Sequence, residues 1–356
     1  MPQSLSYLPP VYLFYLIPDT NFFATFEKPA KTTDVMKFAS FLHFFSLFLL
    51  LSGCNRDTCC DEPLQEMNFE APAPQEFINL QETARETLST NIIFQAEQGL
   101  EHTSDNGMMI IIPQGCFTSA DGQLIDGDIT LEFIELYDRN DMLVTNKPSM
   151  GQITEQIRSL LIGERFFYLN LTRDGQQIVS DCGIQIRVPI SQTGDAAEDM
   201  FLWEGMENEN DSFFWNVYTE GEFFTENGYY VTYVSGNGWK GIAHAANYPG
   251  EKAGIQVLAS DGYNGENAAV YLAYADEKHA IAQLYWDNKT SMFTDPYRQF
   301  SPNLDIHLLF ISAEGEQWRY AVKSITAEAD KIYTIAHSET STATLTELLS
   351  VIAKLP

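Results

Sequence analysis

The stretch GDITLEFIEL, residues 127–136, alternates apolar and polar side chains along its length. The odd-numbered positions carry the apolar residues Ile129, Leu131 and Phe133, and the even-numbered positions between them carry the polar residues Thr130 and Glu132. Successive side chains of a β-strand point to opposite faces of its sheet. The stretch therefore predicts a strand with one buried face and one solvated face.

Similar short apolar or alternating runs lie on both sides of this stretch, separated by turns that contain Gly, Asp or Asn. Two Asp-Gly turns flanked by apolar runs, at 120–123 and 173–176, indicate hairpins. The other runs of the first half are 91–97, 107–113, 165–175, 183–190 and 200–205. A second set follows from about residue 241, at 253–259, 268–275, 280–286, 305–313, 317–325 and 331–337. This pattern predicts a mainly β protein with two antiparallel β-sandwich-like modules.

Two segments have helical spacing instead. Residues 151–163 place apolar side chains at helical intervals, at Ile153, Ile157, Leu160 and Leu161. Near the end of the chain, Thr344 followed by Glu347 resembles a capping box. It precedes an apolar stripe formed by Leu345, Leu348, Leu349, Ile352 and Leu355. We therefore expect a helix at 151–163 and a short amphipathic C-terminal helix.

The segment MKFASFLHFFSLFLLLSGC, residues 36–54, has one basic residue, Lys37, and then 14 residues without a charge. A helix of that length spans roughly 21 Å, which is short of a hydrocarbon core of about 30 Å. The segment matches the apolar region of a signal peptide better than a membrane anchor. The alternative is a buried helix that ends at Gly53 beside a chance cysteine.

Leu51-Ser52-Gly53-Cys54 resembles the lipobox of bacterial lipoproteins. This resemblance implies that Cys54 carries the lipid attachment and that the preceding residues are removed. It divides the chain into residues 1–35 as an over-extended gene start and 36–53 as the signal peptide. Next come a flexible, acidic tether at 54–77 and a β-sandwich domain at 78–240. The chain ends with a second β-rich domain at 241–356, which includes the C-terminal helix.

The charge balance limits the partners of this protein. The chain has 20 basic and 49 acidic residues, a net charge of −29. Phosphate backbones repel such a surface, so we expect no nucleic acid among the partners. Anionic lipid headgroups repel it too, so we expect contact with the membrane only through the lipid anchor.

Five cysteines occur, of which Cys54 is assigned to the lipid. Cys116 and Cys182 lie in separate strand-like segments, and an exported protein lies where disulfides persist. A Cys116–Cys182 bridge and two buried unpaired thiols are both compatible with the sequence. No pair of cysteines or histidines has zinc-ligand spacing.

The stretch from Gly107 to Met150 resembles the opening of a domain found in envelope lipoproteins of Bacteroidetes-type bacteria, which is itself similar to the ZU5 domain of ankyrins and netrin receptors. The matching features are Gly107, the apolar run into Pro113, Gly115, the Asp121-Gly122 turn and NDMLVTNKP at 140–148. The resemblance covers about residues 92–218 and continues more weakly through GNGWKG at 236–241. It implies a β-sandwich interaction module and carries over no catalytic residue.

No hydrolase motif marks a catalytic residue, and we expect no enzyme activity and no cofactor. Calcium is the main metal alternative, because Asp and Asn gather in four turns. None of the four fits a calcium-loop motif, and turns favour these residues for backbone reasons, so we expect no metal. The turns are Asp121/Asp126/Asp128, Asp138/Asn140/Asp141, residues 207–212 and Asp261/Asn264/Glu266.

Ten aromatic residues lie between Phe213 and Trp239. They suit either a stacking platform for sugars or peptides, or a sandwich core that extends to the junction between domains. We expect Trp215 in the core and Trp239 at the junction, with Trp239 as the candidate aromatic contact.

Together these observations predict a cell-envelope protein, lipid-anchored in the outer membrane, with a binding or scaffolding role towards envelope proteins or glycans. The rival hypothesis is a polysaccharide-active hydrolase. An acidic cleft holding a carboxyl group with a raised pKa would favour this rival.

Overall fold

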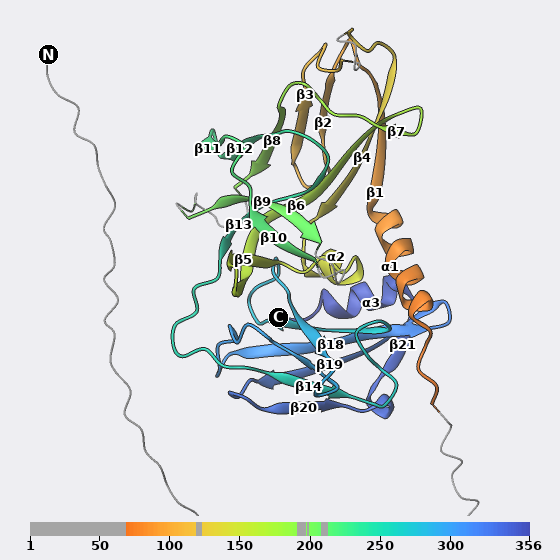
Figure 1. Cartoon of the computed structure of the whole chain (residues 1–356), viewed down its shortest axis with the longest axis vertical. Helices are drawn as coiled ribbons and strands as arrows, with labels where there is room; N and C mark the ends of the chain where they lie inside the picture. Colours follow the sequence, from red (N-terminus) through yellow and green to blue (C-terminus); the bar gives the residue numbers. More distant parts are fainter. Residues whose placement is uncertain (1–68, 119–122, 191–196, 198, 208–212) are drawn as a thin grey trace, which may run out of the picture. The chain divides into compact units, whose positions relative to one another are not determined.

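The computed structural model describes residues 69–118, 123–190, 197, 199–207 and 213–356 (Figure 1). Cys54, the signal peptide and the residues before it lie outside the described residues. So do residues 54–68 of the expected tether, the Asp121-Gly122 turn and most of the acidic turn at 207–212.

Two sheets form the first module. The larger one, here called the central sheet, has the order β1 (Ser89–Gln95), β4 (Asp128–Leu136), β6 (Ile157–Arg173), β13 (Gly238–Ala245), β9 (Phe201–Glu207), β10 (Phe213–Val217) and β5 (Met150–Thr154), with β7 (Gln176–Gln177) paired to β6. The five-stranded sheet has the order β11 (Phe223–Glu226), β12 (Tyr229–Val234), β8 (Ile184–Pro189), β3 (Met109–Ile112) and β2 (Leu100–Thr103). Side chains from both sheets share one apolar cluster, the sandwich core.

Strand β4 shows why the central sheet is covered on both faces. Ile129, Leu131 and Phe133 point into the sandwich core, as their alternation predicts. The opposite face is not simply solvated, because Ile134 and Leu136 are buried against the second module. The prediction of one solvated face therefore holds only for the first part of β4.

The second module is one sheet, the C-terminal sheet. Its order is β20 (Ile332–Ile335), β14 (Gln256–Ala259), β17 (Met292–Thr294), β16 (Ala282–Asp287), β15 (Ala268–Tyr274), β18 (Asp305–Glu314), β19 (Gln317–Thr326) and β21 (Ser341–Ala343). Its pairings are antiparallel except that of β14 with β20, which is parallel. Every residue of β15 is buried, with Val270 and Leu272 in the core of this module and Tyr271 and Ala273 on the opposite face.

A single apolar cluster, here called the junction cluster, joins the two modules. It contains side chains from the central sheet, from all three α-helices and from the C-terminal sheet. Its largest members are Phe77, Phe166, Trp203, Phe213, Trp215, Trp239, Tyr271 and Trp318. The expected boundary between residues 240 and 241 falls inside β13, which pairs with β6 and β9 as far as Ala245.

Three α-helices occur in the described residues: α1 (Pro74–Leu88), α2 (Arg139–Val144) and α3 (Leu345–Ile352). A short 3₁₀ helix, η1, spans His337–Glu339. The predicted C-terminal helix is confirmed as α3, with the Thr344 and Glu347 capping box in place. None of the described helices is long and apolar enough to span a membrane.

The helix expected at 151–163 is wrong, because this segment forms β5 and the start of β6. The adjacent residues Leu160 and Leu161 are both buried, one in the C-terminal module's core and the other in the junction cluster. A strand buried on both faces places consecutive apolar residues as a helical stripe does, so the spacing was ambiguous. The last residues of the tether expected at 54–77 belong to α1, which begins at Pro74, a residue favoured in the first helical turn.

Candidate functional site

The predicted aromatic contact, Trp239, is buried in the junction cluster together with Trp215. Trp215 is fully buried, and its Nε1 donates a hydrogen bond of 2.9 Å to the Pro148 carbonyl oxygen. The ring of Trp239 lies 5.1 Å from that of Tyr168, and only 8% of the residue is exposed. Both tryptophans therefore form part of the protein's interior.

Cations of the protein itself cover the aromatic rings on this side of the central sheet. The Lys147 ammonium lies 4.5 Å from the Phe213 ring centroid and 5.9 Å from that of Trp239. The Arg85 guanidinium lies 5.0 Å from the Tyr168 ring centroid. Because a sugar stacks on a ring face, these intramolecular cation–π contacts disfavour a glycan platform here.

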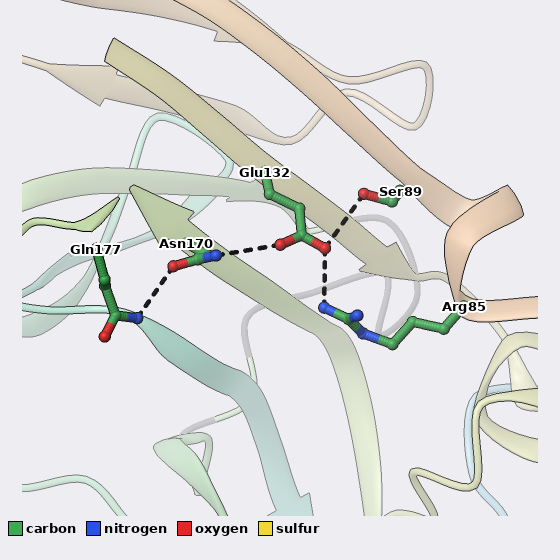
Figure 2. A network of polar contacts seen from close by, with 5 residues as sticks. All are labelled: Arg85, Ser89, Glu132, Asn170 and Gln177. Carbon is green, nitrogen blue, oxygen red and sulfur yellow. Dashed lines mark hydrogen bonds and ion pairs between the residues drawn. The ribbon is translucent and has the colours of Figure 1, made fainter. Parts of the chain in front are cut away.

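The polar side chains beside these rings are also paired with one another. Figure 2 shows Glu132 receiving hydrogen bonds from Arg85, Ser89 and Asn170, and Asn170 receiving one from Gln177. The Arg85–Glu132 ion pair, with an N–O distance of 2.8 Å, ties α1 to β4. This network holds α1 on the central sheet and leaves few free polar groups for a ligand.

Residues 137–149, which include α2 and the whole NDMLVTNKP motif, contact both modules. The backbone N–H of Arg139 donates to the Lys278 carbonyl, and that of Ser149 donates to the Ile281 carbonyl. The Asn146 side-chain oxygen accepts a hydrogen bond of 2.6 Å from the Tyr271 hydroxyl. The motif that supports the family resemblance therefore lies at the junction.

Buried charges accompany α2 at the junction. Arg165 is fully buried, 3.1 Å from the Glu135 carboxylate, and its guanidinium lies 4.4 Å from the Tyr137 ring centroid. Burial, followed by the nearby Asp138 and Glu135 carboxylates, raises the pKa of Asp141 to about 6. Asp141 also accepts a backbone hydrogen bond from Tyr137, which fixes its carboxyl group inside the turn.

Asp141 and Asp295, two carboxyl groups with raised pKa, are both held by backbone hydrogen bonds. Burial raises the pKa of Asp295, yet this side chain accepts backbone hydrogen bonds from Tyr297, Gln299 and Phe300. It lines a cavity of about 20 Å³, which is room for about one water molecule. These positions give no specific support to the hydrolase hypothesis.

Two of the four acidic turns that suggested calcium are occupied by local hydrogen bonds. Asp138 caps α2 and accepts hydrogen bonds from the Asn140 and Asp141 backbone N–H groups. The Asn264 side chain accepts one from the Glu266 backbone. Within the described ranges, no group of three or more His, Cys, Asp or Glu residues is arranged to hold a metal ion.

Cys116 and Cys182, the two cysteines whose state the sequence left open, form a disulfide with a Cα–Cα distance of 5.2 Å. The bridge links the segment after β3 to the segment before β8, at one end of the five-stranded sheet. Both residues contact the sandwich core.

An open groove lies at the same end of the five-stranded sheet, beside the start of β8 and the end of β12. It has a volume of about 350 Å³ and is lined by Gly183, Glu220, Glu222, Tyr233 and Ser235. Tyr233 is 36% exposed, and its hydroxyl accepts a hydrogen bond of 2.7 Å from the Gln185 amide. No described residue forms an ion pair with Glu220 or Glu222.

Close backbone packing fixes the two glutamates of this groove. A Cβ atom on Gly221 would lie 2.7 Å from the Tyr233 carbonyl oxygen, so only glycine allows this approach. The Tyr233 backbone N–H donates to the Glu222 carbonyl. The chain around Glu220 and Glu222 is therefore held against β12.

A buried cation lies behind the groove. Lys240 is only 4% exposed, and its ammonium lies 5.0 Å from the Tyr218 ring centroid. Burial lowers the pKa of Lys240, while Glu204 and Glu220 oppose that effect. The Tyr218 hydroxyl in turn contacts the Ser235 hydroxyl at 3.0 Å.

The groove borders the outer face of the five-stranded sheet, opposite the sandwich core. Paired residues place Phe224, Val231, Arg187 and Met109 in one row across this face, and Tyr233, Gln185 and Ile111 in the next. All three α-helices pack against strands of the other two sheets. Among the described residues no helix covers this face, and Phe224 is 40% exposed on it.

Tyr233 is one of the ten aromatics between Phe213 and Trp239, and no sequence pattern singles out Glu220 or Glu222. Tyr233 points to the opposite face of β12 from the buried Tyr230 and Val234, so the alternation along the strand could have indicated that Tyr233 is exposed. The sequence gives no comparable indication of the distant segments that pair to form the groove. The lipid-attachment candidate Cys54 lies outside the described part of the chain.

A comparison of the chain with models of known protein families gives no match, and a comparison with curated proteins gives none either.

Proposed function

We propose that this protein is lipid-anchored through Cys54 in the outer membrane of a cell envelope and acts there by binding or scaffolding, without catalysis. The first module serves as a ZU5-like interaction domain in this proposal. The observation that carries the binding role is the outer face of the five-stranded sheet, which no described helix covers and which borders an open groove. Uncovered sheet faces with exposed aromatic residues commonly serve as contact surfaces.

Two features support the proposed location. The LSGC sequence ends a basic-then-apolar segment of signal-peptide length. The Cys116–Cys182 disulfide suits an oxidising compartment outside the cytoplasm.

Labelling with radioactive palmitate tests the anchor. The wild-type chain should incorporate label, and Cys54→Ala should accumulate as an unlabelled precursor. Cys59→Ala, a matched change five residues away, should be labelled like the wild type. Persistent labelling of Cys54→Ala would refute the assignment.

Site-specific photo-crosslinking in intact envelopes tests the binding role. A photoreactive phenylalanine analogue at Tyr233 should give discrete adducts. The same analogue at Ile332, which is 49% exposed on the second module, should give none. Equal adducts from both positions, or none from either, would count against a binding role for this face.

A further inference from the structure

The groove lined by Glu220, Glu222 and Tyr233 has the side chains of a site that binds an organic cation. Two carboxylates without a described ion-pair partner lie beside an aromatic ring that is about one-third exposed. An ammonium or guanidinium group is attracted both to carboxylates and to the face of such a ring. We propose that this groove seats a lysine or arginine side chain of a basic, extended polypeptide segment; the inference rests on the proposed binding role.

The composition of the groove argues against a metal ion as its occupant. Calcium takes six to eight oxygen ligands, and magnesium requires near-octahedral geometry. The lining offers two carboxylates, one serine hydroxyl and a tyrosine hydroxyl that already accepts a hydrogen bond from Gln185. An organic cation needs no such coordination shell.

The size of the groove suits one long side chain. Its volume of about 350 Å³ lies at the lower end of the range of roughly 300–1,000 Å³ for ligand pockets. Gly183 allows Tyr233 to approach closely, since a Cβ atom there would lie 3.1 Å from the Tyr233 Cβ.

The neighbouring strand, β11, has an edge that can pair with the backbone of the proposed segment. Strand β11 follows Glu222 directly and pairs only with β12, which leaves its other edge unpaired among the described residues. An extended peptide adds to such an edge through main-chain hydrogen bonds, while its side chains enter adjacent pockets. Phe224 and the Arg187–Glu226 ion pair, at 3.1 Å, lie on the face beside this edge.

Long-range electrostatics favours the same partner. The net charge of −29 attracts cationic segments and repels polyanions. Lys240 offsets the negative charge at the groove only in part, because its single ammonium interacts with Glu204 as well as with Glu220.

Fluorescence anisotropy with labelled octalysine tests the proposal on the full-length, lipidated protein in a neutral detergent. Glu220→Gln combined with Glu222→Gln should weaken binding about tenfold, because charge-assisted contacts of this kind are strong. Glu82→Gln combined with Glu86→Gln, on the exposed face of α1, makes the same charge change away from the groove and should weaken binding less than about twofold. Tyr233→Leu should weaken binding as well, and Tyr233→Phe should not.

Equal losses in the two charge variants would overturn the proposal, because they would show attraction to the whole acidic surface. Absence of octalysine binding to the wild type would overturn it too. Binding of neutral maltohexaose that is lost in Tyr233→Leu, but not in the glutamate variant, would replace the polypeptide by a glycan. If octalysine does not bind but crosslinks at Tyr233 persist, the groove is not a cation site, while the binding role of this face stands. If neither octalysine binding nor crosslinks are observed, both proposals are refuted. Unchanged melting temperatures of the variants confirm that each is folded.

Discussion

Trp215 and Trp239 lie in β10 and β13, the two strands on either side of β9 in the central sheet, and differ slightly in burial. Trp215 is fully enclosed by Phe166, Phe213 and the Pro148 carbonyl. Trp239 is 8% exposed, and the Lys147 ammonium lies 5.9 Å from its ring centroid.

Replacing Trp215 with alanine should destabilise the protein by about 3–5 kcal/mol, the usual cost of emptying a large buried site. Urea unfolding followed by circular dichroism measures this change. Phe224→Ala, at an exposed position on the five-stranded sheet, is the matched aromatic control and should cost under about 1 kcal/mol. Similar losses in both variants would mean that the junction cluster is not tightly packed.

Asp141 should make stability fall as pH rises from about 4 to about 6. Its pKa is raised to about 6 in the folded protein, so the folded state holds a proton that the unfolded chain has already lost. The stability contribution of this proton is fully present below the unfolded pKa and is lost as pH rises through the folded pKa.

Asp141→Asn removes this titration and keeps an oxygen that accepts the Tyr137 hydrogen bond. The variant should match the wild type near pH 4 and exceed its stability by about 3 kcal/mol at pH 7. Urea unfolding at several pH values measures the difference. A constant offset across this range would show that Asp141 is not the titrating group.

At the scale of elements, α3 depends on its N-terminal cap. The Thr344 hydroxyl accepts the Glu347 backbone N–H, and the Glu347 carboxylate accepts the Thr344 backbone N–H. Thr344→Ala should cost about 1 kcal/mol, because the cap is lost and Leu348 and Ile352 depend on the helix for burial. Thr346→Ala on the exposed side of α3 should cost nothing measurable in the same thermal melts. Equal effects would indicate that the capping box does not stabilise α3.

The disulfide stabilises the end of the five-stranded sheet. Cys116 and Cys182 are 66 residues apart, so the bridge removes much of the conformational freedom of the unfolded chain. Cys116→Ala combined with Cys182→Ala should destabilise by about 2–5 kcal/mol in chemical denaturation. Dithiothreitol should weaken the wild type by a similar amount and leave the double variant unchanged. Insensitivity of the wild type to reductant would contradict a stabilising bridge.

At the scale of the whole molecule, the junction cluster makes the two modules one cooperative unit. It takes side chains from both modules and buries charged and polar groups of residues 137–149 between them. Calorimetry of the full chain should therefore give one unfolding transition. A chain that ends after Ala245 should expose the junction cluster and lose that transition or aggregate. Two well-separated transitions in the full chain would show that the modules unfold independently.

The sequence by itself determined the local features of this protein. Strand parity in β4 predicted which side chains enter the sandwich core, and the Thr344–Glu347 pair predicted α3, because both depend on residues close together in the chain. The mainly β class followed from the same local alternation.

Only the tertiary structure decided the features that depend on pairing between distant segments. It showed that the residues expected to form a helix at 151–163 lie in strands, because the second module buries the other face of the central sheet. It joined Cys116 to Cys182, which spacing alone left open. It also placed Glu220 and Glu222 beside Tyr233, since a groove between a loop and a strand arises from packing and leaves no periodic pattern in the sequence.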